Sequence, residues 1–383
     1  MIDFTQNLAI YLKKELCYND ISNIENKQEI SMKQLTVAVI GCGKIANSAH
    51  LPAISENSEV KIKYAIDVIE ERAKKAAEKY GIPNFAADYK DALKDKEVDA
   101  VIICTPNYSH YTICMDSLRA GKHVFCEKPV TVNYALSLEM AKEADKQGKL
   151  LEIGVCNRYN RTVEIIKELY DTGALGDIYH VCCNFRSFRS IPGLGGDFTN
   201  RAIAGGGVLI DWGIHFLDLV LYILGLPKLK TVSAETYVKL GKDIKNYAYK
   251  DMWAGPAVEN GIYDVEDFVT GFIRTEKASI AFNGAWAQNI GTEEMFIDFI
   301  GDKAGVRMDY FGNYRLYTAH DGRLEEVIAD YKKESMYRME TQAFFRATAT
   351  GTRTRNNVNN VLESMRLLDM IYQSAEQHKE ILL

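Results

Sequence analysis

From Leu35 onward, short apolar runs alternate with longer stretches whose apolar residues recur at helical spacing. This alternation constrains the fold more than any other feature, because it is typical of a parallel sheet flanked by helices. Strands are expected at residues 35–40, 61–66, 100–104, 123–126 and 151–155, and helices at residues 70–80, 110–120 and 133–147. Right-handed crossovers would join these elements into a doubly wound parallel α/β domain over residues 35–155.

The second half of the chain, residues 156–383, has a different pattern. After a predicted helix, one apolar run follows another with polar turns between them, at residues 178–188, 229–240, 265–274, 279–288 and 295–300. Strands that follow strands indicate a large, mostly antiparallel sheet. Helical patterns at residues 335–348 and 358–377 close this second α/β domain. A glycine-rich loop, residues 192–207, and a polar insertion, residues 241–263, interrupt the strand pattern.

Composition excludes several classes of protein. The chain has 383 residues, 47% of them hydrophobic, which suits two packed domains. A net charge of −6 leaves no basic surplus for binding nucleic acid. The eight cysteines include no Cys-x-x-Cys pair, so we expect a reducing, cytoplasmic compartment. No His/Cys pair has a partner pair at zinc spacing, so we expect no metal site. Residues 1–34 are an extension without a signal-peptide pattern, and no apolar run is long enough for a membrane partner.

A glycine-rich turn follows the first predicted strand, with the sequence Gly41-Cys-Gly43-Lys-Ile-Ala46. Gly41 permits a tight turn, Gly43 lets the backbone approach a pyrophosphate, and Ala46 allows the helix to pack closely on the strand. The helix that begins near Lys44 and Ile45 offers unpaired N–H groups to phosphate.

Asp67 follows the second predicted strand and could accept hydrogen bonds from an adenosine ribose. Because an acidic group there disfavours a 2′-phosphate, NAD is expected rather than NADP. Asp67 lies 26 residues after Gly41, which is longer than the usual spacing of about 20. A surface aspartate without a binding role is the alternative.

Three polar residues, Asp211, His215 and Asp218, interrupt the apolar stretch 208–225 at positions i, i+4 and i+7. In a helix they share one face, so they should face a wet cleft or satisfy one another. Histidine is the natural proton acceptor near neutral pH, and a carboxylate one turn away can orient it. The alternative is a carboxylate that favours the helix dipole together with a satisfied core histidine.

Taken together, the motifs resemble the Gfo/Idh/MocA oxidoreductases, named after glucose-fructose oxidoreductase, inositol dehydrogenase and a rhizopine catabolism protein. The resemblance runs from about residue 35 to the C-terminus. It rests on the glycine-rich turn with His50-Leu-Pro, then Thr105-Pro-Asn-x-x-His110, Ala120-Gly-Lys-His-Val124, Glu127-Lys128-Pro129 and Gly206-Gly-x-x-x-Asp211-x-Gly-x-His215-x-x-Asp218. It implies an N-terminal Rossmann domain and a C-terminal domain whose open sheet covers the substrate cleft and forms homodimers or homotetramers.

The resemblance also implies roles for individual residues. Lys128 would contact the nicotinamide ribose and the substrate hydroxyl, His215 would be the acid/base, and Asp211 would bind substrate and position the site. The cofactor would further contact Thr105, Pro106, Asn107, His110 and Glu127. The chemistry agrees, because oxidising a secondary alcohol requires a cation and a base at one hydroxyl while hydride leaves the carbon.

Substrate contacts are less defined by the sequence. Arg158 belongs to a segment that resembles one facing the nicotinamide, although a surface ion pair is equally compatible with its position. Arg201 lies where relatives often carry a Trp-Arg pair, and the different residues here leave the substrate open. We expect an NAD-dependent dehydrogenase for a secondary hydroxyl of a sugar, glycoside or cyclitol. The alternatives are a glycosidase that uses NAD for transient oxidation and a non-enzymatic, cofactor-sensing regulator.

Overall fold

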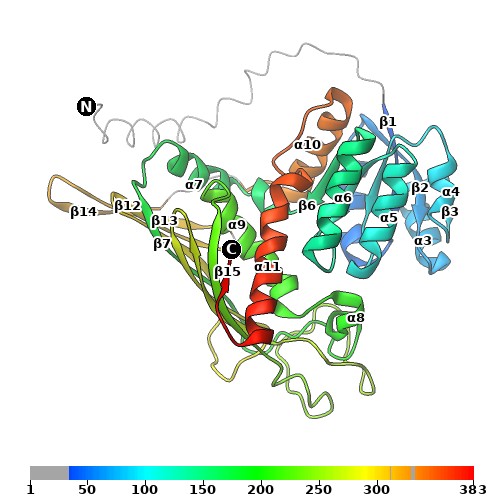
Figure 1. Ribbon diagram of the computed structural model, residues 1–383. Helices are drawn as coiled ribbons and strands as arrows, with labels where there is room; N and C mark the ends of the chain where they lie inside the picture. Colours follow the sequence, from blue (N-terminus) through cyan, green and yellow to red (C-terminus); the bar gives the residue numbers. More distant parts are fainter. Residues whose placement is uncertain (1–33, 311, 329–332) are drawn as a thin grey trace.

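The computed structural model describes residues 34–310, 312–328 and 333–383. They form a six-stranded sheet and a nine-stranded sheet, with helices packed between the two (Figure 1). The two sheets confirm the predicted fold class. The predicted N-terminal extension lies outside the described residues, apart from Gln34.

The six-stranded sheet has the order β3-β2-β1-β4-β5-β6, and all of its strand pairs are parallel. Its strands are β1 (Leu35–Ile40), β2 (Val60–Ile66), β3 (Asn84–Ala86), β4 (Ala100–Ile103), β5 (His123–Glu127) and β6 (Leu151–Gly154). Five of them lie within one residue of their predicted ends. The edge strand β3 was not predicted, because it has three residues and none of them is buried.

Helices cover both faces of this sheet, as in doubly wound folds (Figure 1). They are η2 (Ala46–His50), α2 (Leu51–Ser55), α3 (Glu70–Tyr80), α4 (Lys90–Lys94), α5 (Asn107–Arg119) and α6 (Tyr134–Gln147). Helix α5 begins three residues earlier than predicted, directly after Pro106. This early start brings Asn107 to the carboxyl edge of the sheet.

The second sheet has the order β14-β13-β12-β11-β7-β10-β9-β8-β15 and is mostly antiparallel, since only the central β7–β10 pair among its described strands is parallel. Its strands are β7 (Ile178–Arg186), β8 (Leu229–Tyr237), β9 (Phe268–Thr275), β10 (Ser279–Ala285), β11 (Glu294–Gly301), β12 (Ala304–Asp309), β13 (Tyr314–His320), β14 (Arg323–Ile328) and β15 (Ile381–Leu382). The first five were predicted, and β12 to β15 were not.

One face of the nine-stranded sheet is covered by helices that lie between it and the first domain (Figure 1). They are α7 (Arg161–Asp171), α9 (Ile214–Ile223) and α11 (Val358–Gln377). Among the described residues no helix covers the opposite face (Figure 1). Strand β7 shows this difference, because buried and partly exposed residues alternate along much of it.

Helix α10 (Met336–Thr350) packs with the first domain although it comes late in the chain (Figure 1). Phe344 and Phe345 belong to the same buried cluster as β1 and β4, and the Phe344 ring lies 5.7 Å from that of Phe125. The predicted division of the chain at residue 155 stays a prediction, but this helix packs across it.

The stretch Arg201–Ile223 is long and apolar enough to cross a membrane by length and composition. It comprises α8 (Arg201–Ala204), η5 (Leu209–Gly213) and α9. In its most apolar window 83% of the residues are buried within the protein, so packing accounts for its apolar character. The described cysteines are all free thiols, and the cytoplasmic location stays a prediction.

Candidate active site

The glycine-rich turn after β1 has the geometry of a phosphate-binding turn. Gly41 has a φ of +93°, and a Cβ atom at this position would lie 2.5 Å from the carbonyl oxygen of Cys104. Only glycine fits there, because β1 and β4 end side by side. Beside Gly43, by contrast, nothing lies within 4 Å of the Cβ position among the described residues. Helical structure begins at Lys44, so this open space and the first helical N–H groups fit a pyrophosphate.

Asp67 braces this turn from the end of β2. Its carboxylate accepts hydrogen bonds from the backbone N–H of Cys42 (2.9 Å) and of Ile69 (2.8 Å). A carboxylate oxygen can accept more than one hydrogen bond, so the contacts leave Asp67 able to accept from a ribose hydroxyl. Its role as a cofactor ligand stays a prediction.

The segment 105–110 follows β4 and makes contacts in both domains. The Asn107 side chain donates to the carbonyl oxygen of Ala204 in the second domain (2.8 Å). The buried ring of His110 lies 2.9 Å from the carbonyl oxygens of both Thr105 and Pro129, and burial lowers its pKa. His110 therefore fixes the loops after β4 and β5 relative to each other. The proposed cofactor contacts of Thr105, Pro106, Asn107 and His110 stay predictions.

Glu127, the last residue of β5, is held by a buried hydrogen bond. The Nε2 atom of His50 lies 2.5 Å from the Oε1 atom of Glu127, while Oε2 accepts from the backbone N–H of Lys128 (3.0 Å). Burial would raise the pKa of Glu127, but the hydrogen bond with His50 and the charge of Lys128 outweigh it and lower the pKa. Glu127 is thus an anion whose two oxygens are both occupied, directly before the lysine of the proposed site.

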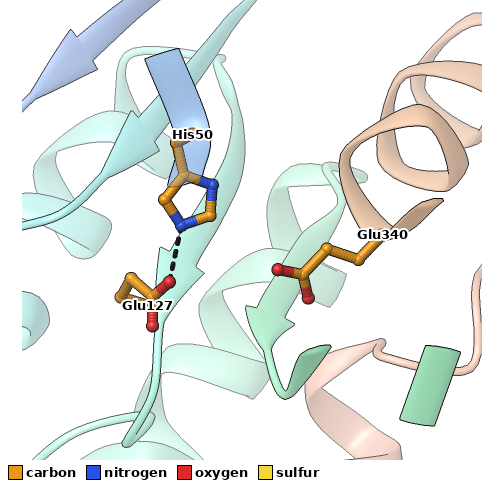
Figure 2. Close-up of side chains that lie close together, drawn as sticks. All are labelled: His50, Glu127 and Glu340. Carbon is orange, nitrogen blue, oxygen red and sulfur yellow. Dashed lines mark hydrogen bonds and ion pairs between the residues drawn. The ribbon is translucent and has the colours of Figure 1, made fainter. Parts of the chain in front are cut away.

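Glu340 on α10 points toward this pair from the other side (Figure 2). One ligand atom from each of His50, Glu127 and Glu340 lies within 4.8 Å of the others, a spacing that a metal ion could bridge. The His50–Glu127 contact is nevertheless a direct hydrogen bond. Burial and the negative charge of Glu127 raise the pKa of Glu340 well above its usual value and so favour its neutral carboxyl form.

Lys128 meets Asp211 across the boundary between the domains. Its Nζ atom lies 3.0 Å from Oδ1 and 3.1 Å from the main-chain oxygen of Asp211, which is part of η5. Burial alone would lower the pKa of Lys128, but the charges of Asp211 and Glu127 outweigh it and raise the pKa. Lys128 is therefore a cation. The Oδ2 atom of Asp211 is buried and has no hydrogen-bond partner among the described residues.

His215 lies one turn further along the same helical stretch. Its Nδ1 atom is 3.2 Å from the amide nitrogen of Asn157, which belongs to η3 (Cys156–Tyr159) directly after β6. The Asn157 amide can meet Nδ1 with its nitrogen as donor or, turned over, with its oxygen as acceptor, and in the second arrangement Nδ1 carries the proton and Nε2 has the free lone pair that a base needs. Burial and the nearby charge of Lys128 lower the pKa of His215 well below its usual value. At neutral pH the ring is uncharged and able to take up a proton.

Arg158 does not belong with these groups. It is fully buried, and its guanidinium donates to both carboxylate oxygens of Asp218, at 2.8 and 2.7 Å. It also donates to the main-chain oxygens of Arg355 and Asn360, and Ser364 donates to Asp218. The predicted alternative of a surface ion pair is wrong, because this pair is in the core. Because Arg158 is enclosed in the core with these partners, it is not available as a substrate contact.

The three polar residues of the 208–225 helix each have a partner elsewhere in the protein. Among the described residues Asp211, His215 and Asp218 do not pair with one another, so the expectation that they satisfy one another is wrong. Each bonds instead to a residue outside the helix, Asp211 to Lys128, His215 to Asn157 and Asp218 to Arg158. The alternative expectation, a wet cleft, stays open for Asp211 and His215. Arg201 is exposed and lies 3.7 Å from Glu266, and its role as a substrate contact stays a prediction.

Two further residues of the site were not singled out from the sequence. Asn157 orients His215, and Tyr310 follows β12 with its ring 6.4 Å from that of His215. Burial raises the pKa of Tyr310, so its hydroxyl stays neutral. Asn157 lay within a segment noted for its resemblance, next to Arg158. Tyr310 had no local signal, because its position depends on β12, which was not predicted.

Comparison with known proteins agrees with this geometry. Residues 35–155 match the family described as "Oxidoreductase family, NAD-binding Rossmann fold", and residues 163–307 match the "GFO/IDH/MocA C-terminal domain". The chain is 33% identical over 300 residues to the D-glucoside 3-dehydrogenase of Escherichia coli, covering 78% of this chain and 83% of that protein. It is 30% identical over 213 residues to the myo-inositol 2-dehydrogenase of Thermotoga maritima, covering 55% and 60%.

The fold is also similar to that of levoglucosan dehydrogenase in complex with NADH. The TM-score is 0.79 at 20% sequence identity, over 91% of this chain and 98% of that one. The family models span most of the two described domains, and the first of them is that of an NAD-binding Rossmann domain. The chain therefore belongs to the Gfo/Idh/MocA family of oxidoreductases.

Proposed function

We propose that this protein is an NAD-dependent dehydrogenase that transfers hydride between nicotinamide and a secondary hydroxyl of a sugar, glycoside or cyclitol. The observation that carries the proposal is the convergence of a cation and a neutral base. Lys128 lies at the carboxyl edge of an NAD-binding sheet and is bonded to Asp211. The uncharged His215 follows Asp211 on the same helical stretch, and the charge of Lys128 acts on it.

The three side chains divide the work of alcohol oxidation. NAD, when bound, supplies the hydride acceptor. Lys128 stabilises the negative charge that develops on the substrate oxygen, and His215 accepts the hydroxyl proton at its ring. Asp211 holds Lys128 with Oδ1, and its Oδ2 atom, which has no hydrogen-bond partner in the described part of the chain, could accept from a second substrate hydroxyl. In the opposite direction the same groups would return a proton to a reduced carbonyl.

Asp67 supports the preference for NAD over NADP. Its carboxylate at the end of β2 would repel a ribose 2′-phosphate. The test is to titrate the protein with NADH and with NADPH and to follow the cofactor fluorescence. NADH should bind more tightly, and tighter binding of NADPH would contradict the preference.

The substrate class is supported by the relatives. The D-glucoside 3-dehydrogenase aligns over most of both chains, and its name specifies a ring hydroxyl of a glucoside. We infer that a glycoside is the preferred substrate, with inositols as the second class. Arg201, exposed at the start of α8, stays a proposed substrate contact.

We also propose that the protein forms homodimers or homotetramers through its nine-stranded sheet. The face away from the helices bears partly exposed side chains and no helix among the described residues. Light scattering after size-exclusion chromatography gives the mass in solution. A monomer would contradict this proposal.

The function is tested by a screen of sugars, glycosides and inositols for NADH formation. Reduction of NAD by a glycoside, lost in Lys128→Ala and in His215→Ala, would support the dehydrogenase. Release of the aglycone with no net NADH would support the glycosidase alternative. Tight NADH binding with no reaction on any compound would support the regulator.

A further inference from the structure

The insertion 241–263 contains no helix or strand, yet it is fixed to the glycine-rich loop 192–207. The backbone N–H of Val258 donates to the carbonyl of Leu194 (2.8 Å), and that of Ile262 donates to Gly195 (3.3 Å). Gly195 has a φ of +82°, and a Cβ atom there would lie 2.3 Å from the carbonyl oxygen of Val258. The two segments therefore form one packed unit of the second domain.

This unit reaches the glycine-rich turn of the first domain. The Nζ atom of Lys44 donates to the main-chain oxygen of Trp253, in the middle of the insertion, and lies 5.4 Å from the centre of its ring. The Trp253 ring meets that of Phe198, from the 192–207 loop, edge to face at 4.9 Å. An ammonium group over an indole ring is a favourable contact, so the turn and the insertion attract each other.

The Lys44–Trp253 contact lies beside the turn that fits a pyrophosphate. Lys44 directly follows Gly43, beside which the structure is open, and it begins the helix whose N–H groups fit a pyrophosphate. Trp253 is still 36% exposed although it bridges two domains. A large, partly exposed aromatic residue beside an open polar site is well placed to bury part of a ligand.

We propose that Trp253 is a cofactor-contact residue supplied by the second domain, which with Phe198 covers the pyrophosphate-binding turn and slows the release of the bound dinucleotide. The proposal rests on the proposed function only in that NAD or NADH occupies this turn. It adds that part of the cofactor site lies on the 241–263 insertion, outside the Rossmann domain. Release of cofactor then requires the Lys44–Trp253 contact to open.

The experiment measures NADH dissociation from the full chain by stopped-flow fluorescence after mixing with excess NAD. Trp253→Ala should release NADH about tenfold faster or more, and Trp253→Phe should fall between it and the wild type. Tyr249→Ala is the matched control, because Tyr249 is an exposed aromatic residue of the same insertion, and it should release NADH at the wild-type rate.

The outcomes separate this proposal from the proposed function. Unchanged NADH release in Trp253→Ala, with sugar oxidation intact, would overturn the proposal that Trp253 covers the bound cofactor. The proposed dehydrogenase function would stand. Faster NADH release in Trp253→Ala, with no sugar oxidised by the wild type, would support the role of Trp253 as a cover of the cofactor. It would count against the proposed dehydrogenase function. Equal acceleration by Tyr249→Ala would also overturn the specific role of Trp253, since it would indicate a general loosening of the insertion.

Discussion

The Nζ atom of Lys128 lies 3.0 Å from the carboxylate of Asp211, and this ion pair joins the end of β5 to the helical stretch of the second domain. Burial opposes the charge of Lys128, and Asp211 is the largest influence that restores it. The pair thus keeps a cation in a partly buried position where a substrate oxygen would become negative. Lys128 thus serves as the cation and His215 as the base, and the proposed chemistry needs one of each.

Replacing Asp211 by Asn should lower kcat for sugar oxidation by roughly ten- to a hundredfold, because Lys128 loses its main counter-charge. The pKa of Lys128 should also fall. Since the protonated lysine is the active form, activity is lost as pH rises through that pKa, and the loss should move to lower pH in Asp211→Asn. The measurement is kcat against pH for both proteins. Superimposable alkaline limbs would contradict the role of Asp211.

His215 should set the acid limit of the reaction. Its pKa in the folded protein lies well below 6.5, and the neutral ring is the proton acceptor. The rate of oxidation should therefore stay level as pH falls toward 6.5 and decline only at lower pH, where the ring becomes protonated. The profile of kcat/KM against pH measures this. A decline centred above 6.5 that disappears in His215→Gln would show that the ring titrates differently.

Arg158 should matter for stability rather than for cofactor binding. Arg158→Met leaves the carboxylate of Asp218 buried without its partner, which should lower the free energy of unfolding by about 3–5 kcal/mol. The control is Arg315→Met, because the ion pair of Arg315 with Glu326, between β13 and β14, is exposed, and its loss should change little. Urea unfolding measures both variants. Equal effects, or unchanged stability in Arg158→Met, would be inconsistent with a core ion pair.

Glu340 gives a prediction with a defined sign. Its pKa is raised in the folded protein, so folding takes up a proton and stability falls as pH rises above about 4.5, the usual pKa of a glutamate. Glu340→Gln cannot ionise and should raise the free energy of unfolding at pH 8 by roughly 1 kcal/mol or more, with no gain at pH 4. Urea unfolding at the two values tests it. A loss of stability at pH 8 would show that Glu340 is needed as an anion.

The sequence predicts the first domain well because its signals are local. Buried parallel strands such as β4 are continuous apolar runs, and glycine, proline and polar residues mark their ends. In the second domain, β14 escaped prediction because its residues are almost all exposed and carry no alternating pattern. Helix α10 was predicted as a helix, but its amphipathic pattern does not say which domain its apolar face meets.

The candidate site shows the same division. The motif residues Lys128, Asp211 and His215 could be singled out from the sequence, and the structure adds which groups they contact. The pairing of Arg158 with Asp218 could not be predicted, because the two residues are far apart in the chain and either could have faced solvent. Asn157 and Tyr310 reach His215 only through the packing of η3, the end of β12 and α9 against one another within the second domain, which no spacing in the sequence encodes.

The most direct test of the central claim follows the hydride itself. The wild-type protein is incubated with NAD and a glucoside that carries deuterium on the ring carbon of each secondary hydroxyl, and the NADH formed is analysed by mass spectrometry. We predict that one deuterium appears in the nicotinamide ring of NADH and that Lys128→Met forms NADH at least about a hundredfold more slowly. NADH without deuterium, or an equal rate in Lys128→Met, would contradict the proposed hydride transfer.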